Sequence, residues 1–247
     1  MSCTKLIPAV LGATVFLAAC SDANGPASNR VAFQVATRAA AAARGAALVG
    51  TTYTLGSDQI TFESVSIVLH KIELGLTSAP ACDSEVADDC EELKAGPVTL
   101  DLPLGDGAVT QFAVTVPPGS YDKVEFKVAP DPATGYSIRV TGSCTCGGTT
   151  STFDNTTTAF TSDLDAEQEH EFSAPITIPG PSGGSAGVTL FVDLSKWFAN
   201  QAGDGFVDPL TALHGGANEG LVKENIKNSL DAFEDENHDG HDDHGGN

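Results

Sequence analysis

The densest set of side chains that could do chemistry lies in residues 235–247. Oxygen donors recur at alternate positions, and one of them, that of His241, is a backbone carbonyl: Asp235, Asn237, Asp239, His241 and Asp243. These are positions 1, 3, 5, 7 and 9 of a D-x-[DN]-x-D-G loop, with Gly240 at position 6. A hard cation takes about six to eight oxygen ligands, and the glycine permits the sharp turn. The spacing therefore predicts a Ca²⁺ loop.

One position departs from this pattern. Position 12 is Gly246, where an EF-hand has a bidentate glutamate, so we expect weak binding of the kind found in extracellular modules. Two alternatives stay open. The tail could be a solvated acidic segment with no specific site. It could also buffer Zn, Cu or Ni, because His238, His241 and His244 recur at every third residue among aspartates.

Signals for catalysis are poor. The sequence contains no G-x-S-x-G elbow, P-loop, H-E-x-x-H motif or dinucleotide fingerprint. His70 and His170 fall in predicted strands, where we expect partnered or outward-facing histidines, and His214 stands beside two glycines in a predicted loop. The odd-numbered acids from Asp163 to Glu171 would share one strand face, as a second cation patch or a solvated face. We predict that the protein is not an enzyme.

The N-terminus indicates export. One lysine, the short apolar run Leu6–Leu17 and small residues before a cysteine are typical of a secretory signal, and the run is too short to span a bilayer. The segment Leu17–Cys20 looks like the lipobox of bacterial lipoproteins, which implies cleavage before Cys20 and its lipidation. The alternative is an ordinary signal peptide in which Cys20 is incidental. The resemblance implies a bacterial cell-envelope protein, extracytoplasmic and lipid-anchored, and Ser21 is similar to an outer-membrane sorting context.

Composition limits the partners. The formal net charge is −21, which excludes nucleic-acid binding through a basic surface and favours attraction of cations. We expect the membrane as a partner through the lipid anchor. An envelope protein or glycan is a further possible partner that the sequence does not identify.

Four cysteines lie in the body of the chain: Cys82, Cys90, Cys144 and Cys146. An even number in an oxidising compartment indicates disulfides. We favour a Cys82–Cys90 bridge closing a polar loop and a local Cys144–Cys146 pair. Cross-pairing between the two loops is the alternative.

The body of the chain reads as short strands separated by turns. Ser64–Leu76 has the strongest strand signal, and its apolar run predicts a central position buried on both faces. Residues 112–116 and 124–128 alternate about a turn at 117–120 and predict a β-hairpin with one wet face. Trp197 and Phe198 are expected to be packing anchors. The expected organisation is a signal peptide (1–19), a flexible tether (20–30), a β-sandwich domain (31–200), a linker loop (201–217), an amphipathic helix (218–234) and the tail (235–247).

The turn at Val116–Tyr121 resembles that of transthyretin-like and carboxypeptidase-regulatory-like β-sandwiches. The wider pattern is similar to a family of bacterial lipoproteins of unknown function that contain such a sandwich. Four stretches carry the similarity: Ser64–Leu74, Phe160–Phe172, Val188–Phe198 and Ile226–Gly240. The resemblance implies a mainly β, antiparallel sandwich of transthyretin or immunoglobulin type with a short C-terminal helix, and it brings no activity with it. We therefore expect a non-enzymatic binding or structural module with a weak Ca²⁺ loop, and a transition-metal buffer as the alternative.

Overall fold

The computed structural model describes residues 30–38, 50–77, 90–105, 109–154, 164, 166–178, 185–235, 237 and 239–242. Over these ranges the chain is mainly β, and its strands form two sheets that enclose a common apolar core. The predicted fold class, a mainly β sandwich with a short helix near the C-terminus, is confirmed.

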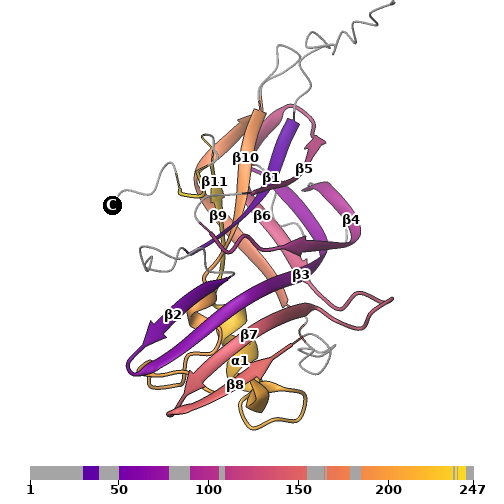
Figure 1. The fold of residues 1–247 in the computed structure, drawn as a ribbon. Helices are drawn as coiled ribbons and strands as arrows, with labels where there is room; N and C mark the ends of the chain where they lie inside the picture. Colours follow the sequence, from indigo (N-terminus) through magenta and orange to yellow (C-terminus); the bar gives the residue numbers. More distant parts are fainter. Residues whose placement is uncertain are drawn as a thin grey trace, which may run out of the picture.

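The elements follow one another along the chain with a helical segment inserted before the last strand (Figure 1). They are β1 (Arg30–Thr37), β2 (Thr51–Leu55), β3 (Asp58–Leu76), β4 (Cys90–Asp101), β5 (Val109–Thr115), β6 (Gly119–Val128), β7 (Ile138–Cys146), β8 (Thr149–Phe153), β9 (Ala166–Ile178), β10 (Ser185–Val192), the 3-10 helices η1 (Leu194–Lys196) and η2 (Pro209–Ala212), α1 (Glu219–Lys227) and β11 (Leu230–Glu234). Sheet A has the order β11-β10-β1-β5, and sheet B has the path β8-β7-β3-β6-β9 with β2 and β4 also paired to β3.

Sheet A is built around the first strand. β1 pairs in parallel with β10 and antiparallel with β5. Val31 and every residue from Phe33 to Thr37 are buried, so both faces of this strand are covered. The parallel pair is an exception within the predicted antiparallel sandwich, because β1 and β10 are far apart in sequence and no hairpin constrains their direction.

Strand β3 holds the molecule together, and its predicted central position is confirmed. It has nineteen residues and four neighbours. Its first half pairs with β2 and β7, and its second half pairs with β4 and β6, so it runs through both halves of the fold (Figure 1). Register shifts mark β-bulges beside Glu63 and His70, which bend the strand between these halves.

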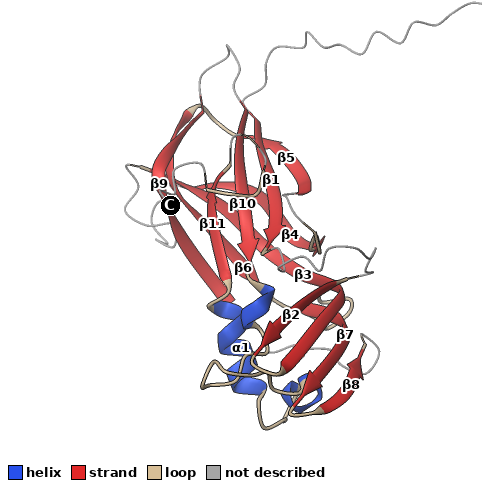
Figure 2. Cartoon of the chain, turned by 60° about the vertical axis from the view of Figure 1, so that its left-hand side comes forward, coloured by secondary structure: helices blue, strands red, loops and turns tan. Residues whose placement is uncertain are grey.

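The half of the fold that contains β2, β7 and β8 is covered by the segment between β10 and β11, which lies at the bottom of Figure 2. Trp197 and Phe198 follow η1 and are fully buried, which confirms them as packing anchors. The Phe62 ring of β3 meets the Trp197 ring edge-on at 6.2 Å and stacks on the Phe198 ring at 6.0 Å. Residues 201–217 also pack here, since Ala212 and Phe206 are buried, so this segment is more than the expected linker.

The prediction of a β-hairpin about the turn at residues 117–120 is wrong, because β5 and β6 do not pair with each other. β5 pairs with β1 in sheet A, whereas β6 pairs with β3 and β9 in sheet B. The connection is a crossover between sheets, because Pro117 and Pro118 lack the N–H groups that would continue a ladder. The prediction of a solvent-exposed face on this strand is also wrong, since Lys123 and Glu125, which lie on that face, are buried.

The helix predicted over residues 218–234 is too long. α1 ends at Lys227, and Leu230–Glu234 forms strand β11 on β10. The hydroxyl of Ser229 donates to the Ile226 carbonyl oxygen at 2.7 Å, inside the turn that follows the helix. The prediction rested on the helical spacing of Val222, Ile226, Leu230 and Phe233. The last two of these residues belong to β11, which is stabilised by pairing with β10.

Candidate functional site

The predicted Ca²⁺ loop begins where β11 ends. Asp235 is fully buried, and its backbone N–H donates to the Gly187 carbonyl oxygen of β10 at 3.1 Å. A Cβ atom at Gly187 would collide with the Asp235 carbonyl oxygen, so this close approach requires glycine. The first position of the loop is therefore fixed to sheet A.

The Asp235 carboxylate organises the turn that follows it. One oxygen accepts from the Asp239 N–H at 3.1 Å, and the other accepts from the Gly240 N–H and the Thr189 hydroxyl, both at 2.9 Å. Gly240 is buried at a φ of +83°, a conformation that glycine adopts without strain. These three bonds satisfy a carboxylate that would otherwise be costly to bury.

Two further residues of the predicted ligand set, Asn237 and Asp239, close smaller turns with their side-chain oxygens. The side-chain oxygen of Asn237 accepts from the Asp239 N–H at 2.9 Å, and a carboxylate oxygen of Asp239 accepts from the His241 N–H at 2.9 Å. The structure thus brings Asp235, Asn237, Asp239 and His241 into one tight turn. Asp243 lies outside the described residues.

The chemistry of this turn suits a hard cation, although its side chains do not form a ready-made cluster. In the part of the chain that the structure describes, no three His, Cys, Asp or Glu side chains lie close enough together to hold a metal ion. An ionised carboxylate has about four lone-pair sites, and Asp235 uses three of them. Asp239 also keeps acceptor capacity, so the loop offers oxygen ligands of the type that Ca²⁺ prefers.

A pocket of about 370 Å³ adjoins the loop. Its walls include Phe191 of β10 and Phe233 of β11, whose ring centroids are 6.2 Å apart, together with Gly240, His241 and Asp242 of the loop. The loop therefore forms one side of a partly aromatic cavity.

The three histidines that precede the tail all have structural partners. Nε2 of His70 lies 2.8 Å from the Pro130 carbonyl oxygen. His170 stacks on the Phe126 ring at 5.3 Å, and its Nδ1 lies 3.2 Å from the Asp231 carboxylate. His214 lies in a loop, with its Nδ1 3.4 Å from Glu219.

Two carboxyl groups beside these histidines have lowered pKa values. The hydrogen bond with His170 holds the pKa of Asp231 below its ordinary value, against an opposing effect of burial. Hydrogen bonds from Lys223 and the Gly215 N–H lower the pKa of Glu219 to about 2. Both groups are therefore ionised at neutral pH.

The acidic run of β9 faces lysines. Glu169 lies 3.3 Å from Lys123, and Glu167 lies 3.9 Å from Lys71. Lys71 is also 2.9 Å from both Glu73 and Glu125; burial opposes its charge, but the hydrogen bonds to these carboxylates raise its pKa above the ordinary value. This face is a ladder of ion pairs, whereas Asp163 and Asp165 lie outside the described residues.

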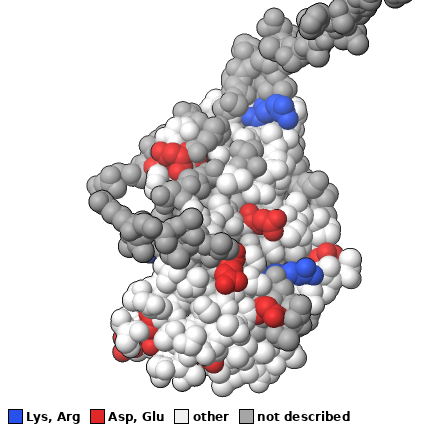
Figure 3. Space-filling model, viewed as in Figure 1, with Lys and Arg blue, Asp and Glu red and all other residues white. Residues whose placement is uncertain are grey.

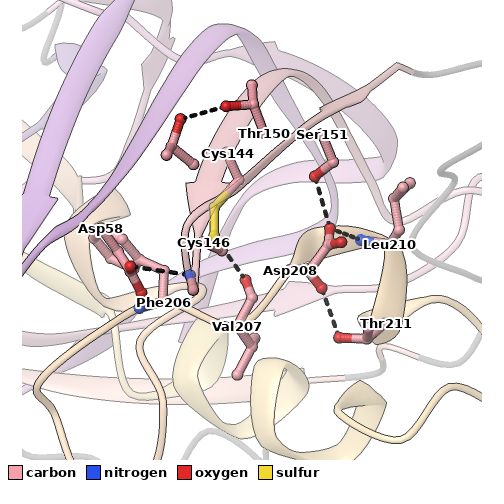
Figure 4. The surroundings of a disulfide bond; sticks show 12 residues. Asp58, Cys144, Cys146, Thr150, Ser151, Phe206, Val207, Asp208, Leu210 and Thr211 are labelled. Carbon is pink, nitrogen blue, oxygen red and sulfur yellow. Dashed lines mark hydrogen bonds between the residues drawn. A yellow bond between two sulfur atoms is a disulfide. The ribbon is translucent and has the colours of Figure 1, made fainter.

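Cys144 and Cys146 are joined as a disulfide, the local pair favoured from the sequence, with Cα atoms 5.5 Å apart (Figure 4). They belong to strand β7 and not to the predicted loop, because only Gly147 and Gly148 make the turn to β8. Cys82 and Cys20 lie outside the described residues, and Cys90 opens β4. The Cys82–Cys90 bridge and the lipidation of Cys20 stay predictions.

Two aspartates that the sequence analysis missed attach residues 204–211 to this hairpin (Figure 4). Asp58 accepts from the N–H groups of Gly147 and Phe206, each at 3.0 Å. Asp208 accepts from the Ser151 hydroxyl at 2.9 Å and the Leu210 N–H at 3.0 Å. The Asp-Pro pair at the start of η2 is a helix-capping signal that could have revealed the second of them.

The chain matches no protein-family model, no curated protein and no solved structure. Among the described residues, no helix is both long enough and apolar enough to cross a membrane. Figure 3 shows one face of the molecule, on which the charged side chains of the described residues are scattered.

Proposed function

We propose that this protein is a lipid-anchored, extracytoplasmic and non-enzymatic binding or structural module whose C-terminal loop takes up Ca²⁺ weakly. The observation that carries the calcium part is the turn wound around Asp235, which is buried and bonded to β10 at the first position of the D-x-N-x-D-G sequence. A cation that binds only the wound loop would stabilise it by mass action. Ca²⁺ would then strengthen the attachment of the tail to sheet A.

The anchor is proposed from the lipobox-like segment Leu17–Cys20. Strand β1 begins at Arg30, and ten residues of chain reach at most about 35 Å, so a lipid on Cys20 would hold the sandwich close to the membrane surface. Metabolic labelling with a fatty-acid analogue tests this. Label in the wild type and none in Cys20→Ser is expected, and an unlabelled wild type would contradict the anchor.

Calorimetry and thermal melting with Ca²⁺ test the loop. Asp239→Asn should weaken binding, because it removes one charge at position 5. Gly246→Glu should tighten binding, because it supplies the carboxylate missing at position 12. Asp242→Asn is the matched control, since it removes the same charge from the loop at a position outside the ligand pattern.

The outcome distinguishes three readings of the tail. No Ca²⁺-dependent change in any variant would leave a solvated acidic tail. Uptake of Zn²⁺ or Cu²⁺ without Ca²⁺, lost on replacing His238, His241 and His244 by Gln, would identify the transition-metal buffer instead.

A further inference from the structure

A second pocket, of about 280 Å³, lies on the face of sheet B that points away from the apolar core. Its floor is the middle of β3, and its walls come from β4, from β7 and from the connection between β6 and β7. Seven polar side chains line it: Ser64, Ser66, Thr99, Asp101, Asp131, Thr134 and Arg139. This pocket is separate from the C-terminal loop.

The strand register places opposite charges on the two sides of the floor. Ser66 is paired with Asp101 of β4 across one edge of β3 and with Arg139 of β7 across the other. Directly paired residues stand on the same face of a sheet, and strands on either side of a third are about 9.6 Å apart. An acid and a base therefore flank a central hydroxyl in a single row.

Neither charge is used within the described part of the protein. The Asp101 carboxylate and the Arg139 guanidinium have no hydrogen bond or ion pair with any described residue. The guanidinium instead lies over the Tyr136 ring, 4.4 Å from its centroid, which holds it on its own side of the pocket. The two charges face the pocket without neutralising each other.

The third wall is held in place. The Asp131 carboxylate accepts from the Ala133 N–H at 2.8 Å and from the Thr134 hydroxyl, so it is committed to its own turn. Nε2 of His70 bonds to the Pro130 carbonyl oxygen, and the Val68 N–H donates to the Ser137 carbonyl oxygen at 2.8 Å. Both ends of this connection are thereby fastened to β3, and the pocket is preformed.

The geometry points to a binding site for a small zwitterion, an amino acid or a dipeptide, with its carboxylate at Arg139 and its ammonium group at Asp101. Guanidinium groups match carboxylates in a bidentate manner, and carboxylates accept from ammonium groups. The net charge of −21 repels free anions but not a neutral zwitterion. The hydroxyls of Ser66, Thr99 and Thr134 can bond to the polar groups between the two ends.

Titration of the full chain with glycine and with glycylglycine, followed by NMR chemical shifts, tests this proposal. Saturable shifts at residues of β3, β4 and β7 are expected from at least one probe, and the comparison sets the spacing of the charges. Acetate, methylamine and glucose are the matched probes, because each lacks one or both charges. Acetate or methylamine binding as tightly as the zwitterions would overturn the proposal, as would no saturable shift from either zwitterion.

Variants locate the binding. Arg139→Gln and Asp101→Asn should each weaken it about tenfold or more, since each removes one charged hydrogen-bond partner. Arg30→Gln and Asp122→Asn remove the same charges elsewhere and should leave binding unchanged. Ser66→Leu should block the pocket while leaving both charges in place. Undiminished binding in this correctly folded variant would overturn the assignment of the site.

Discussion

The imidazole of His170 and the carboxylate of Asp231 join the edges of the two sheets, with Nδ1 and Oδ1 3.2 Å apart. His170 belongs to β9, the last strand on the sheet B path, and Asp231 belongs to β11, the last strand of sheet A. The His170 ring stacks almost flat on Phe126, which holds its Nδ1 toward β11. A polar contact thus bridges the edges of the two sheets.

Asp231→Asn should lower the melting temperature at neutral pH by a modest amount, because the Asp231 side chain is 66% exposed and solvent screens the pair. The pKa of Asp231 is lower in the folded protein than the ordinary 3.8. Its contribution is therefore fully present above 3.8 and is lost as pH falls through the lower folded value. Melting curves between about pH 7 and about pH 2 should show the two proteins converging only in acid. A difference independent of pH would contradict this account, and Asp122→Asn is the control.

Lys71→Met should destabilise the fold by about 3 kcal/mol, because it leaves the buried carboxylates of Glu73 and Glu125 without their common cation. Adding Glu73→Gln and Glu125→Gln to Lys71→Met should restore part of the loss. Urea unfolding measures both effects. Lys227→Met is the control, and equal effects from the two lysines would contradict the central role of Lys71.

Ser229→Ala should cost about 1 to 3 kcal/mol, because it leaves the buried indole N–H of Trp197 without an acceptor. The indole nitrogen donates to the Ser229 hydroxyl at 2.8 Å, and both residues are buried. Trp197 is the only tryptophan, so its fluorescence during denaturation reports directly on this contact. Ser57→Ala, in an exposed turn, should change stability by less than about 0.5 kcal/mol.

Gly187→Ala should release the C-terminal loop, because the added Cβ would collide with the Asp235 carbonyl oxygen. Limited proteolysis should then cut near the C-terminus faster than in the wild type, while the remaining sandwich stays resistant. Gly220→Ala is the matched control, since a Cβ there meets no atom within 4 Å. Equal cleavage of the two variants would show that docking on β10 does not hold the loop.

Local patterns predicted which residues are buried better than they predicted which strands pair. The apolar run of β3 identified the central strand, and Trp197 and Phe198 were identified as anchors. The alternation of residues 112–116 was equally clear, but it defines a face and not a partner. β5 pairs with β1, which lies far earlier in the chain, and only tertiary packing decides that choice.

The candidate site was likewise predictable only where its residues are close together in the sequence. The spacing of Asp235, Asn237 and Asp239 is local, and the structure brings these residues into one turn. The role of Asp58 depends on the backbone of Phe206, 148 residues later, which no local pattern contains. The pocket between Asp101 and Arg139 also arises only from register across three strands.

The position of β1 inside sheet A has a mechanical consequence. A pull on Arg30 along the strand loads the hydrogen bonds to β10 and to β5 together, in shear, because β1 is paired on both sides. An edge strand would instead peel away one bond at a time. Forced unfolding depends on the barrier to rupture rather than on equilibrium stability. A pull on the first strand is therefore opposed by two ladders of hydrogen bonds at once, which is the load that the proposed lipid anchor would apply.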